Sequence, residues 1–131
     1  MQGTVALNRA ELRRYLGRVG DRWRLDAAFL GGAVVADERG APPQRERGPE
    51  YVVVLVSDAY DAIPWLERVY VAGSLWDALE MGARTEIHCY TRAEFARKRA
   101  SLPVVHEAVW QGLDLLGEGW SSRDAVGRAG R

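Results

Sequence analysis

The segment from Thr85 to Gly117, TEIHCYTRAEFARKRASLPVVHEAVWQGLDLLG, constrains the fold of this chain more than any other part. Its first six residues, up to Tyr90, are typical of a short strand. Thr91 followed by Glu94 forms a capping box, which opens a helix. Pro103 is favoured in a first helical turn and the final glycine is a common helix stop, so we expect a second helix between them. The segment therefore predicts a strand followed by two helices.

Two further strands are predicted upstream. Tyr51–Val56 is continuous, apolar and mostly β-branched, which is typical of a central strand covered on both faces. Leu25–Ala36 is also apolar, and we expect a buried strand that bends or bulges at Gly31 and Gly32. The intervening stretch, Asp37–Pro49, contains prolines, glycines and arginines without a large apolar residue, which indicates an exposed loop.

The remaining apolar residues follow helical spacing. Asn8 with Glu11 three residues later is a variant of the capping box, and it opens a helix that we expect to close at Gly20. A second helical region starts at Ser57–Asp61 with Pro64 in its first turn, and an interruption at Gly73–Ser74 divides it in two. The order of elements predicts an α+β fold with a small mixed sheet and helices packed on it. We expect a single domain over residues 1–117 and a polar tail over 118–131.

Composition narrows the classes of function. The chain has 18 basic and 18 acidic side chains, so no net field attracts nucleic acid or an anionic membrane. No apolar run approaches the ~20 residues that span a bilayer. A single cysteine, Cys89, excludes an internal disulfide and fits a reducing compartment. We therefore expect a cytoplasmic protein without nucleic acid or membrane as a partner.

The pattern resembles the minimal nucleotidyltransferase domain, most specifically in the segment that ends at Gly117. In that family a strand ends in Gly-Ser, an Ala-Arg-Gly loop follows, and Asp-x-Asp leads the next strand. Here "FLGG" places Gly31 at the glycine and Gly32 at the serine, and "ERG" at Glu38–Gly40 brings Arg39 to the loop arginine. The resemblance implies that Gly31, Gly32 and Arg39 are the cofactor-binding positions for a nucleoside triphosphate.

The same resemblance implies where magnesium and catalysis belong. "PEYVVVLV" places Glu50 at the first acid and Val52 at the second, and "TEIHCY" places Glu86 at a third. Glu50 and Glu86 are thus the candidate catalytic and metal-binding residues. The second acid normally bridges both ions, and Val52 offers no ligand. Loss of such charge stabilisation lowers a rate on the order of a thousandfold or more, so we expect a catalytically degenerate protein.

Other candidate sites have structural interpretations. Asp58 and Asp61 could form a displaced metal pair, but Ser57 or Asp58 is the residue type expected at a helix N-cap. His88 and Cys89 alternate faces of a strand, which argues against a zinc site. Cys89 has no evident base beside it and is expected in the core. Arg45 and Arg47 belong to a loop that also carries acids, and we expect that loop to be solvated.

Two functions from different classes follow. The first is an interaction or regulatory module on a degenerate nucleotidyltransferase fold. The resemblance implies a protein partner, since small members of the family often pair with helical proteins. The alternative is a magnesium-dependent transferase of atypical site that moves a nucleotide monophosphate; a nucleotide sensor without turnover lies between them. Trp110 falls on the polar face of the last helix, so we expect it to contact a second protein chain, most simply another copy. The competing interpretation is that the tail covers it through Trp120.

Overall fold

The fold was obtained as a computed structural model, which describes residues 6–42 and 48–117. The expected tail at 118–131, including Trp120, lies outside the described residues, as do Arg45 and Arg47. The elements, in chain order, are α1 (Arg9–Arg22), β1 (Ala27–Gly31), α2 (Ala33–Glu38), β2 (Tyr51–Val56), the 3-10 helix η1 (Asp58–Ala62), α3 (Trp65–Ser74), α4 (Ala78–Met81), β3 (Thr85–Tyr90), α5 (Arg92–Ser101), α6 (Pro103–Gln111) and β4 (Leu113–Asp114).

The four strands form one mixed sheet in the order β3-β2-β1-β4. β1 runs antiparallel to β2 and to the short β4, whereas β2 and β3 run parallel. All six residues of β2 are buried, as its continuous apolar sequence predicts for a central strand. The α+β class and the mixed sheet expected from the sequence are therefore confirmed.

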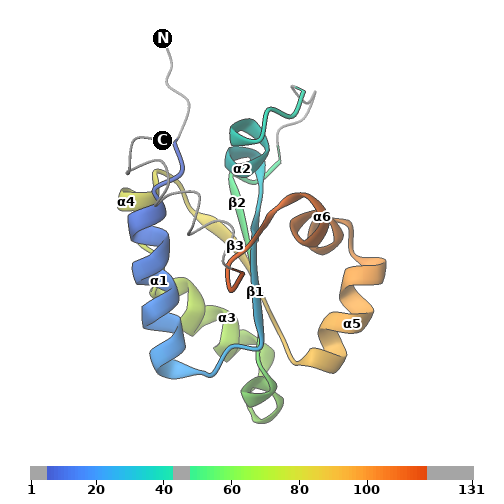
Figure 1. The fold of residues 1–131 in the computed structure, drawn as a ribbon. Coiled ribbons are helices and arrows are strands. Elements are labelled where there is room, and N and C mark those ends of the chain that lie inside the picture. Colours follow the sequence, from blue (N-terminus) through green and yellow to red (C-terminus); the bar gives the residue numbers. More distant parts are fainter. Residues whose placement is uncertain (1–5, 43–47, 118–131) are drawn as a thin grey trace.

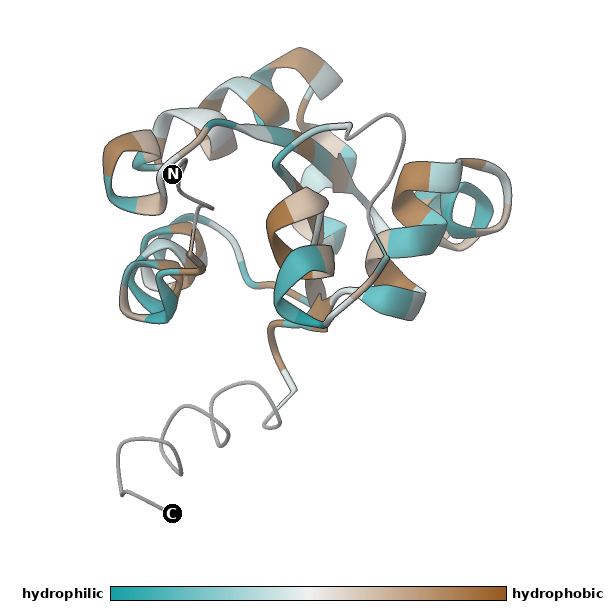
Figure 2. Cartoon of the chain, turned by 90° about the horizontal axis from the view of Figure 1, so that it is seen from above, coloured by the Kyte–Doolittle hydropathy of each residue, from teal (hydrophilic) through white to brown (hydrophobic). Residues whose placement is uncertain are grey.

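Helices cover the sheet on both faces. Figure 1 shows α1, α3 and α4 on one side of the strands and α5 with α6 on the other. The first layer encloses the larger hydrophobic cluster, which includes Tyr15, Tyr51 and Trp76. The second layer encloses a smaller cluster that includes Val52 and Val105. Seen from above, helices on both sides mix hydrophobic and hydrophilic segments, as expected for helices that bury one face (Figure 2).

Several predicted starts of elements are confirmed by their caps. Asn8 Oδ1 accepts a hydrogen bond from Glu11 N at 3.0 Å at the start of α1. Thr91 and Glu94 form the reciprocal capping box of α5. The predicted division of the middle helical region is also present, since α3 ends at Ser74 and α4 begins at Ala78. Its beginning differs, because the residues after Ser57 form the separate 3-10 helix η1 and α3 starts only after Pro64.

The predicted strand over Leu25–Ala36 is wrong in its second half. β1 ends at Gly31, and Ala33–Glu38 forms the helix α2. Gly32 has φ +105°, a backbone conformation that favours glycine, and it turns the chain sharply out of the sheet. The apolar residues of α2 were predicted as strand because a short buried helix has the same continuous apolar pattern. Val34 and Val35 belong to the larger hydrophobic cluster.

The last helix also ends earlier than Gly117. α6 stops at Gln111, and the chain returns as β4 beside β1. A Cβ on Gly112 would lie 2.3 Å from the Leu30 carbonyl oxygen, so only glycine permits this close approach. Leu116, which a helix continued to Gly117 would contain, is instead an exposed residue after β4. No helix in the described ranges is long and apolar enough to cross a membrane.

Candidate functional site

The candidate residues from the sequence converge at one end of the sheet. Because β2 and β3 are parallel, Glu50, immediately before β2, and Glu86, the second residue of β3, lie at the same end. β1 is antiparallel, so its last residue, Gly31, pairs with Val52 at that end too. Gly32 follows directly. The topology therefore brings together four of the five positions that the resemblance implies for metal and nucleotide.

Val52 occupies the centre of this arrangement and is apolar and buried. It is 3% exposed and belongs to the cluster with Val54, Val105 and Ala108. The parallel register places Val52 directly beside Glu86. A carboxylate at position 52 would thus lie next to Glu86, but the valine packs against α6 and offers no oxygen. No group of three or more His, Cys, Asp or Glu side chains within residues 6–42 and 48–117 is arranged to hold a metal ion.

The turn at Gly32 is packed against the start of β2. A Cβ on Gly32 would lie 2.5 Å from the Glu50 carbonyl oxygen and 2.6 Å from Tyr51 Cα. The first two amides of α2 are also engaged: Ala33 N donates to Pro49 O at 2.9 Å and Val34 N to Glu50 O at 3.1 Å. N–H groups that would face a phosphate at a helix start therefore bind the chain itself.

Glu86 belongs to a chain of hydrogen bonds along β3. His88 Nε2 lies 2.7 Å from Glu86 Oε2, and His88 Nδ1 lies 2.9 Å from the Tyr90 hydroxyl. These three residues alternate along the strand and so share the face of Val52. Burial raises the pKa of Tyr90 to about 12, so its hydroxyl is protonated at neutral pH. The alternation was visible in the sequence, but sequence reasoning singled out only Glu86 and the His88–Cys89 neighbours.

The Arg39 side chain is engaged by another part of the chain. It follows α2, and its guanidinium Nη1 donates to the Gly112 carbonyl oxygen at 3.1 Å. This contact ties the end of α2 to the end of α6. The arginine implied by the "ERG" resemblance thus has a structural contact in this chain.

Asp58 also has a structural partner. Its carboxylate accepts hydrogen bonds from Arg92 N at 3.0 Å and Arg92 Nε at 2.9 Å. The hydrogen bond from the Arg92 backbone is the main cause that lowers the pKa of Asp58. The adjacent Ser57 caps η1, accepting from Ala59 N at 3.1 Å. The cap interpretation of Ser57 is confirmed, and Asp58 joins η1 to the start of α5.

A buried arginine that sequence reasoning missed organises the other end of β3. Arg68, on α3, donates to the Ile63 carbonyl, to the Cys89 carbonyl at 3.2 Å and to Glu94 Oε1 at 2.8 Å. These bonds connect α3, β3 and α5. Arg68 falls on the buried side of a helix whose sequence gives no other sign of its role.

Cys89 is a core residue, as the sequence predicts. Its side chain is fully buried, and burial raises the thiol pKa to about 12. A thiol that stays protonated is a poor nucleophile. The Tyr60 hydroxyl beside it is buried without a hydrogen-bond partner among the described residues.

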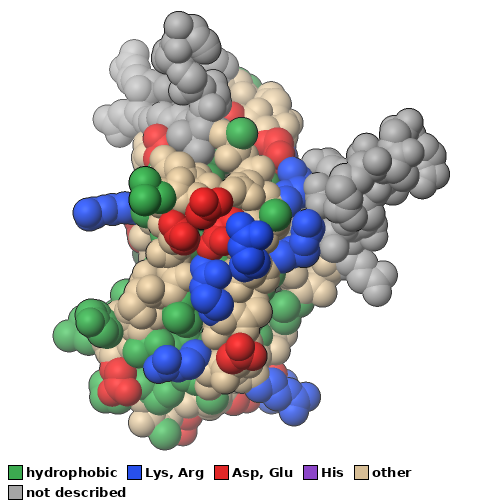
Figure 3. Space-filling model, turned by 90° about the vertical axis from the view of Figure 1, so that its left-hand side faces the viewer, with side chains coloured by type: hydrophobic (Ala, Val, Ile, Leu, Met, Phe, Trp, Pro, Cys, Tyr) green, Lys and Arg blue, Asp and Glu red, His purple; other side chains and the backbone are tan. Residues whose placement is uncertain are grey.

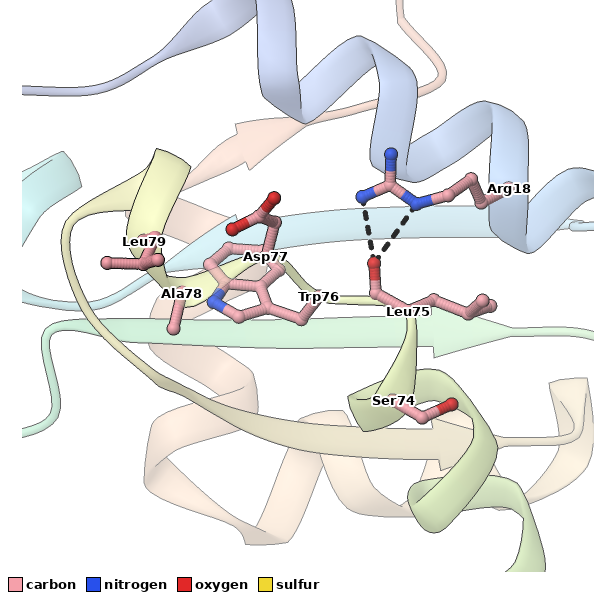
Figure 4. Close-up of a pocket in the computed structure, with 7 residues that line it drawn as sticks. All are labelled: Arg18, Ser74, Leu75, Trp76, Asp77, Ala78 and Leu79. Carbon is pink, nitrogen blue, oxygen red and sulfur yellow. Dashed lines mark hydrogen bonds between the residues drawn. The ribbon is translucent and has the colours of Figure 1, made fainter.

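A shallow depression lies between α1 and the connection from α3 to α4. Figure 4 shows Arg18 reaching from α1 to the Leu75 carbonyl, to which its Nη2 donates at 2.8 Å. The indole N–H of Trp76 donates to Ala83 O at 2.9 Å. The Arg18 bond therefore joins α1 to this connection, and the Trp76 bond closes the segment around α4.

Trp110 lies on the outer side of α6. Its side chain is 68% exposed, and its ring centroid lies 5.9 Å from that of His106. The helix buries Val105 and Ala108 on its opposite side. Trp110 is therefore a large aromatic side chain that remains mostly exposed among the described residues, with His106 beside it.

In comparisons with known proteins, no family model, no curated protein and no solved structure matches this chain significantly.

Proposed function

We propose that this chain is a degenerate nucleotidyltransferase-like domain that acts as an interaction or regulatory module. The observation that carries the proposal concerns the end of the sheet where Glu50, Glu86 and Gly32 lie. Positions that would hold magnesium and phosphate serve packing instead: Val52 lies in the core, Gly32 abuts the backbone of Glu50, and the first amides of α2 bind carbonyl oxygens.

The element order supports the family resemblance behind this proposal. A strand ends at the Gly-Gly turn, a short helix follows, and an antiparallel strand begins after Glu50 with a parallel strand beside it. This is the order that the resemblance requires for its acids to meet. Glu50 and Glu86 are the remnants of that site in our proposal.

The proposed contact surface is the outer side of α6 around Trp110, and its partner is another protein. An exposed tryptophan combines a large apolar area with few rotatable bonds, which is why this residue is enriched among binding hot spots. The balanced charge of the chain gives no reason to favour nucleic acid as the partner.

Titration calorimetry with each of the four ribonucleoside triphosphates, with and without magnesium, tests the degenerate site. We expect no magnesium-dependent heat of binding. Specific binding that requires magnesium and disappears in Glu50→Ala, but persists in the control Asp21→Ala on α1, would favour the alternative of a working nucleotide site.

That alternative has one observation in its favour. Glu50 and Glu86 lie at the same end of neighbouring strands, so both carboxylates could serve a single magnesium ion with an atypical geometry. Within this alternative, nucleotide binding without transfer depends least on a carboxylate at position 52.

A further inference from the structure

One side of α3 is apolar and faces away from the rest of the chain. The helix packs on β3 and buries Arg68 and Ala72. On its outer side Leu66 and Tyr70, one turn apart, are 78% and 77% exposed. Residues four apart are neighbours on a helix surface, so these two side chains form one apolar patch.

The same side of α3 ends in small residues. Gly73 lies two helical turns after Leu66, on the same line along the helix. A Cβ on Gly73 would meet no packed neighbour within 4 Å, so this position is open to solvent. The exposed Ser74 beside it donates its hydroxyl to the Val71 carbonyl at 2.7 Å. The outer side of α3 therefore has a bulky first half and a small second half.

Further apolar surface lies close to α3 in the chain. Trp65 stacks on Tyr90 with ring centroids 5.5 Å apart and is still 41% exposed, and Leu79 on α4 is exposed as well. Figure 3 shows hydrophobic side chains gathered on the lower part of the face viewed there, below the charged residues. Exposed large hydrophobic side chains are thus concentrated on α3 and α4, and an exposed apolar patch favours contact with another molecule.

We propose that α3 packs against α3 of a second copy, with the two helices antiparallel about a two-fold axis between Val69 and Tyr70. Leu66 of each copy then lies on Gly73 of the other, because the two residues are equally far from the axis. The two Tyr70 rings lie next to each other beside the axis. Two-fold symmetry closes the contact at two copies.

Shape selects this arrangement among the possible helix pairs. Parallel helices would place Leu66 against its own counterpart and leave a gap between the two Gly73 residues, where packing contacts are lost. Moving the axis toward the start of α3 places Leu66 against Tyr70 and leaves Gly73 uncovered. Moving it toward the end leaves Leu66 beyond the partner helix.

The same self-complementary shape identifies a second copy as the occupant. One helix supplies both the bulky side chains and the space that receives them. The chain carries equal numbers of basic and acidic side chains, so no net charge opposes the association of copies. A contact between two short helices is smaller than a standard interface, so the dimer is weak and forms as protein concentration rises.

This contact is independent of the surface around Trp110. α3 and α6 lie on opposite sides of the sheet (Figure 1). The α3 contact therefore does not depend on the proposed function, and variants of the two helices separate the two surfaces.

Paired cysteine variants test both the contact and its register. Facing Cα atoms of two packed helices are roughly 5 Å apart, which is within disulfide reach. Leu66→Cys and Gly73→Cys face each other in a mixed dimer, which keeps one unaltered pair of Leu66 and Gly73. Each position lies about 10 Å from its own counterpart along the helix axis, outside that reach. The native Cys89 stays in every variant, since it is buried and protonated.

We expect a mixture of the Leu66→Cys and Gly73→Cys proteins to give, on mild oxidation at high protein concentration, a disulfide dimer that contains one of each. Neither variant alone should cross-link above the level of the unmodified protein. The control mixture of Gly73→Cys with Gln111→Cys, on the exposed side of α6, should also stay at that level. Equal cross-linking of all mixtures, cross-linking of one variant alone, or no mixed dimer from two folded variants would overturn the proposal.

Sedimentation provides the second measurement. The mass of the unmodified protein should rise toward that of two chains as its concentration rises. Tyr70→Glu places two carboxylates together at the axis and should lower the dimer fraction at least tenfold, while the melting temperature of this exposed-site variant stays unchanged. A protein that remains a single chain at every concentration, or a Tyr70→Glu variant that associates as well as the unmodified protein, would overturn the proposal.

Discussion

Val52 lies directly beside Glu86 in the parallel pair of β2 and β3, with its side chain packed into the apolar cluster under α6. A carboxylate in this place would face Glu86, whereas the valine joins the core. In the function that we propose, the position of the second acid therefore stabilises the core instead of binding magnesium.

Val52→Asp should unfold more easily than the unmodified protein by more than about 3 kcal/mol, because it buries a charge next to Glu86. Magnesium should raise the melting temperature of this variant, since a third carboxylate completes the cluster with Glu50 and Glu86. Thermal melts with and without magnesium measure both effects. The melting temperature of Val52→Ala, which only removes methyl groups, should not depend on magnesium. An equal response of both variants would contradict the assignment of position 52 to the second acid.

Gly32→Ser should destabilise the protein by at least about 1–3 kcal/mol, although serine is the residue expected from the family resemblance. The positive φ and the contact with the Glu50 carbonyl leave no room for a Cβ. Urea unfolding measures the change. The matched control is Gly17→Ala, in α1 with no atom near its Cβ position, which should stabilise by about 0.5–1 kcal/mol.

Arg68→Met should cost about 3–5 kcal/mol of unfolding free energy, because it leaves buried carbonyl groups and Glu94 without their donor. Arg92→Met removes an exposed ion pair and should cost less than about 1 kcal/mol. Chemical denaturation of both variants gives the comparison. Similar losses in the two would contradict the assigned role of Arg68.

The stability of the unmodified protein should fall on acidification through the Arg68–Glu94 pair. The hydrogen bond from Arg68 is the main cause that lowers the pKa of Glu94. A lowered folded-state pKa means that the pair contributes fully above the ordinary glutamate range and is lost as pH falls through the folded-state value. The free energy of unfolding should therefore fall less between pH 7 and acid pH in Arg68→Met than in the unmodified protein. Chemical denaturation at a series of pH values measures this.

The single thiol should be unreactive in the native state. Cys89 is buried and its pKa is raised to about 12, so a thiol-specific reagent at pH 8 should modify it only at the rate at which the protein opens. Labelling followed by mass spectrometry, with and without denaturant, measures this. Rapid labelling of the folded protein would place the thiol at the surface.

Trp110→Ala should leave the unfolding free energy within about 0.5 kcal/mol, because the ring is largely exposed and buries little of the core. Ala108→Trp on the buried side of α6 is the opposite case and should prevent close packing on Gly31. A large loss of stability in Trp110→Ala would instead show that the tryptophan makes an intramolecular contact. It would contradict the proposed interaction surface around Trp110.

The sequence predicted those features that rest on local patterns. The strands at Tyr51 and Thr85 and the caps at Asn8 and Thr91 were recovered because periodicity and capping act over a few residues. The helix after Gly32 and the early end of α6 were missed, since they depend on close approaches to Glu50 and Leu30 that only the folded chain makes. Arg68 was missed for the same reason: two of its three acceptors, Cys89 and Glu94, lie more than 20 residues away in the chain.

The most direct test of the central claim is a transfer assay with radiolabelled nucleoside triphosphates, magnesium and the purified protein, which follows label on protein, RNA and small-molecule acceptors. Our account predicts no transfer above background for the unmodified protein, and no difference from Glu50→Ala or Glu86→Ala. Robust magnesium-dependent transfer that Glu50→Ala abolishes would contradict it.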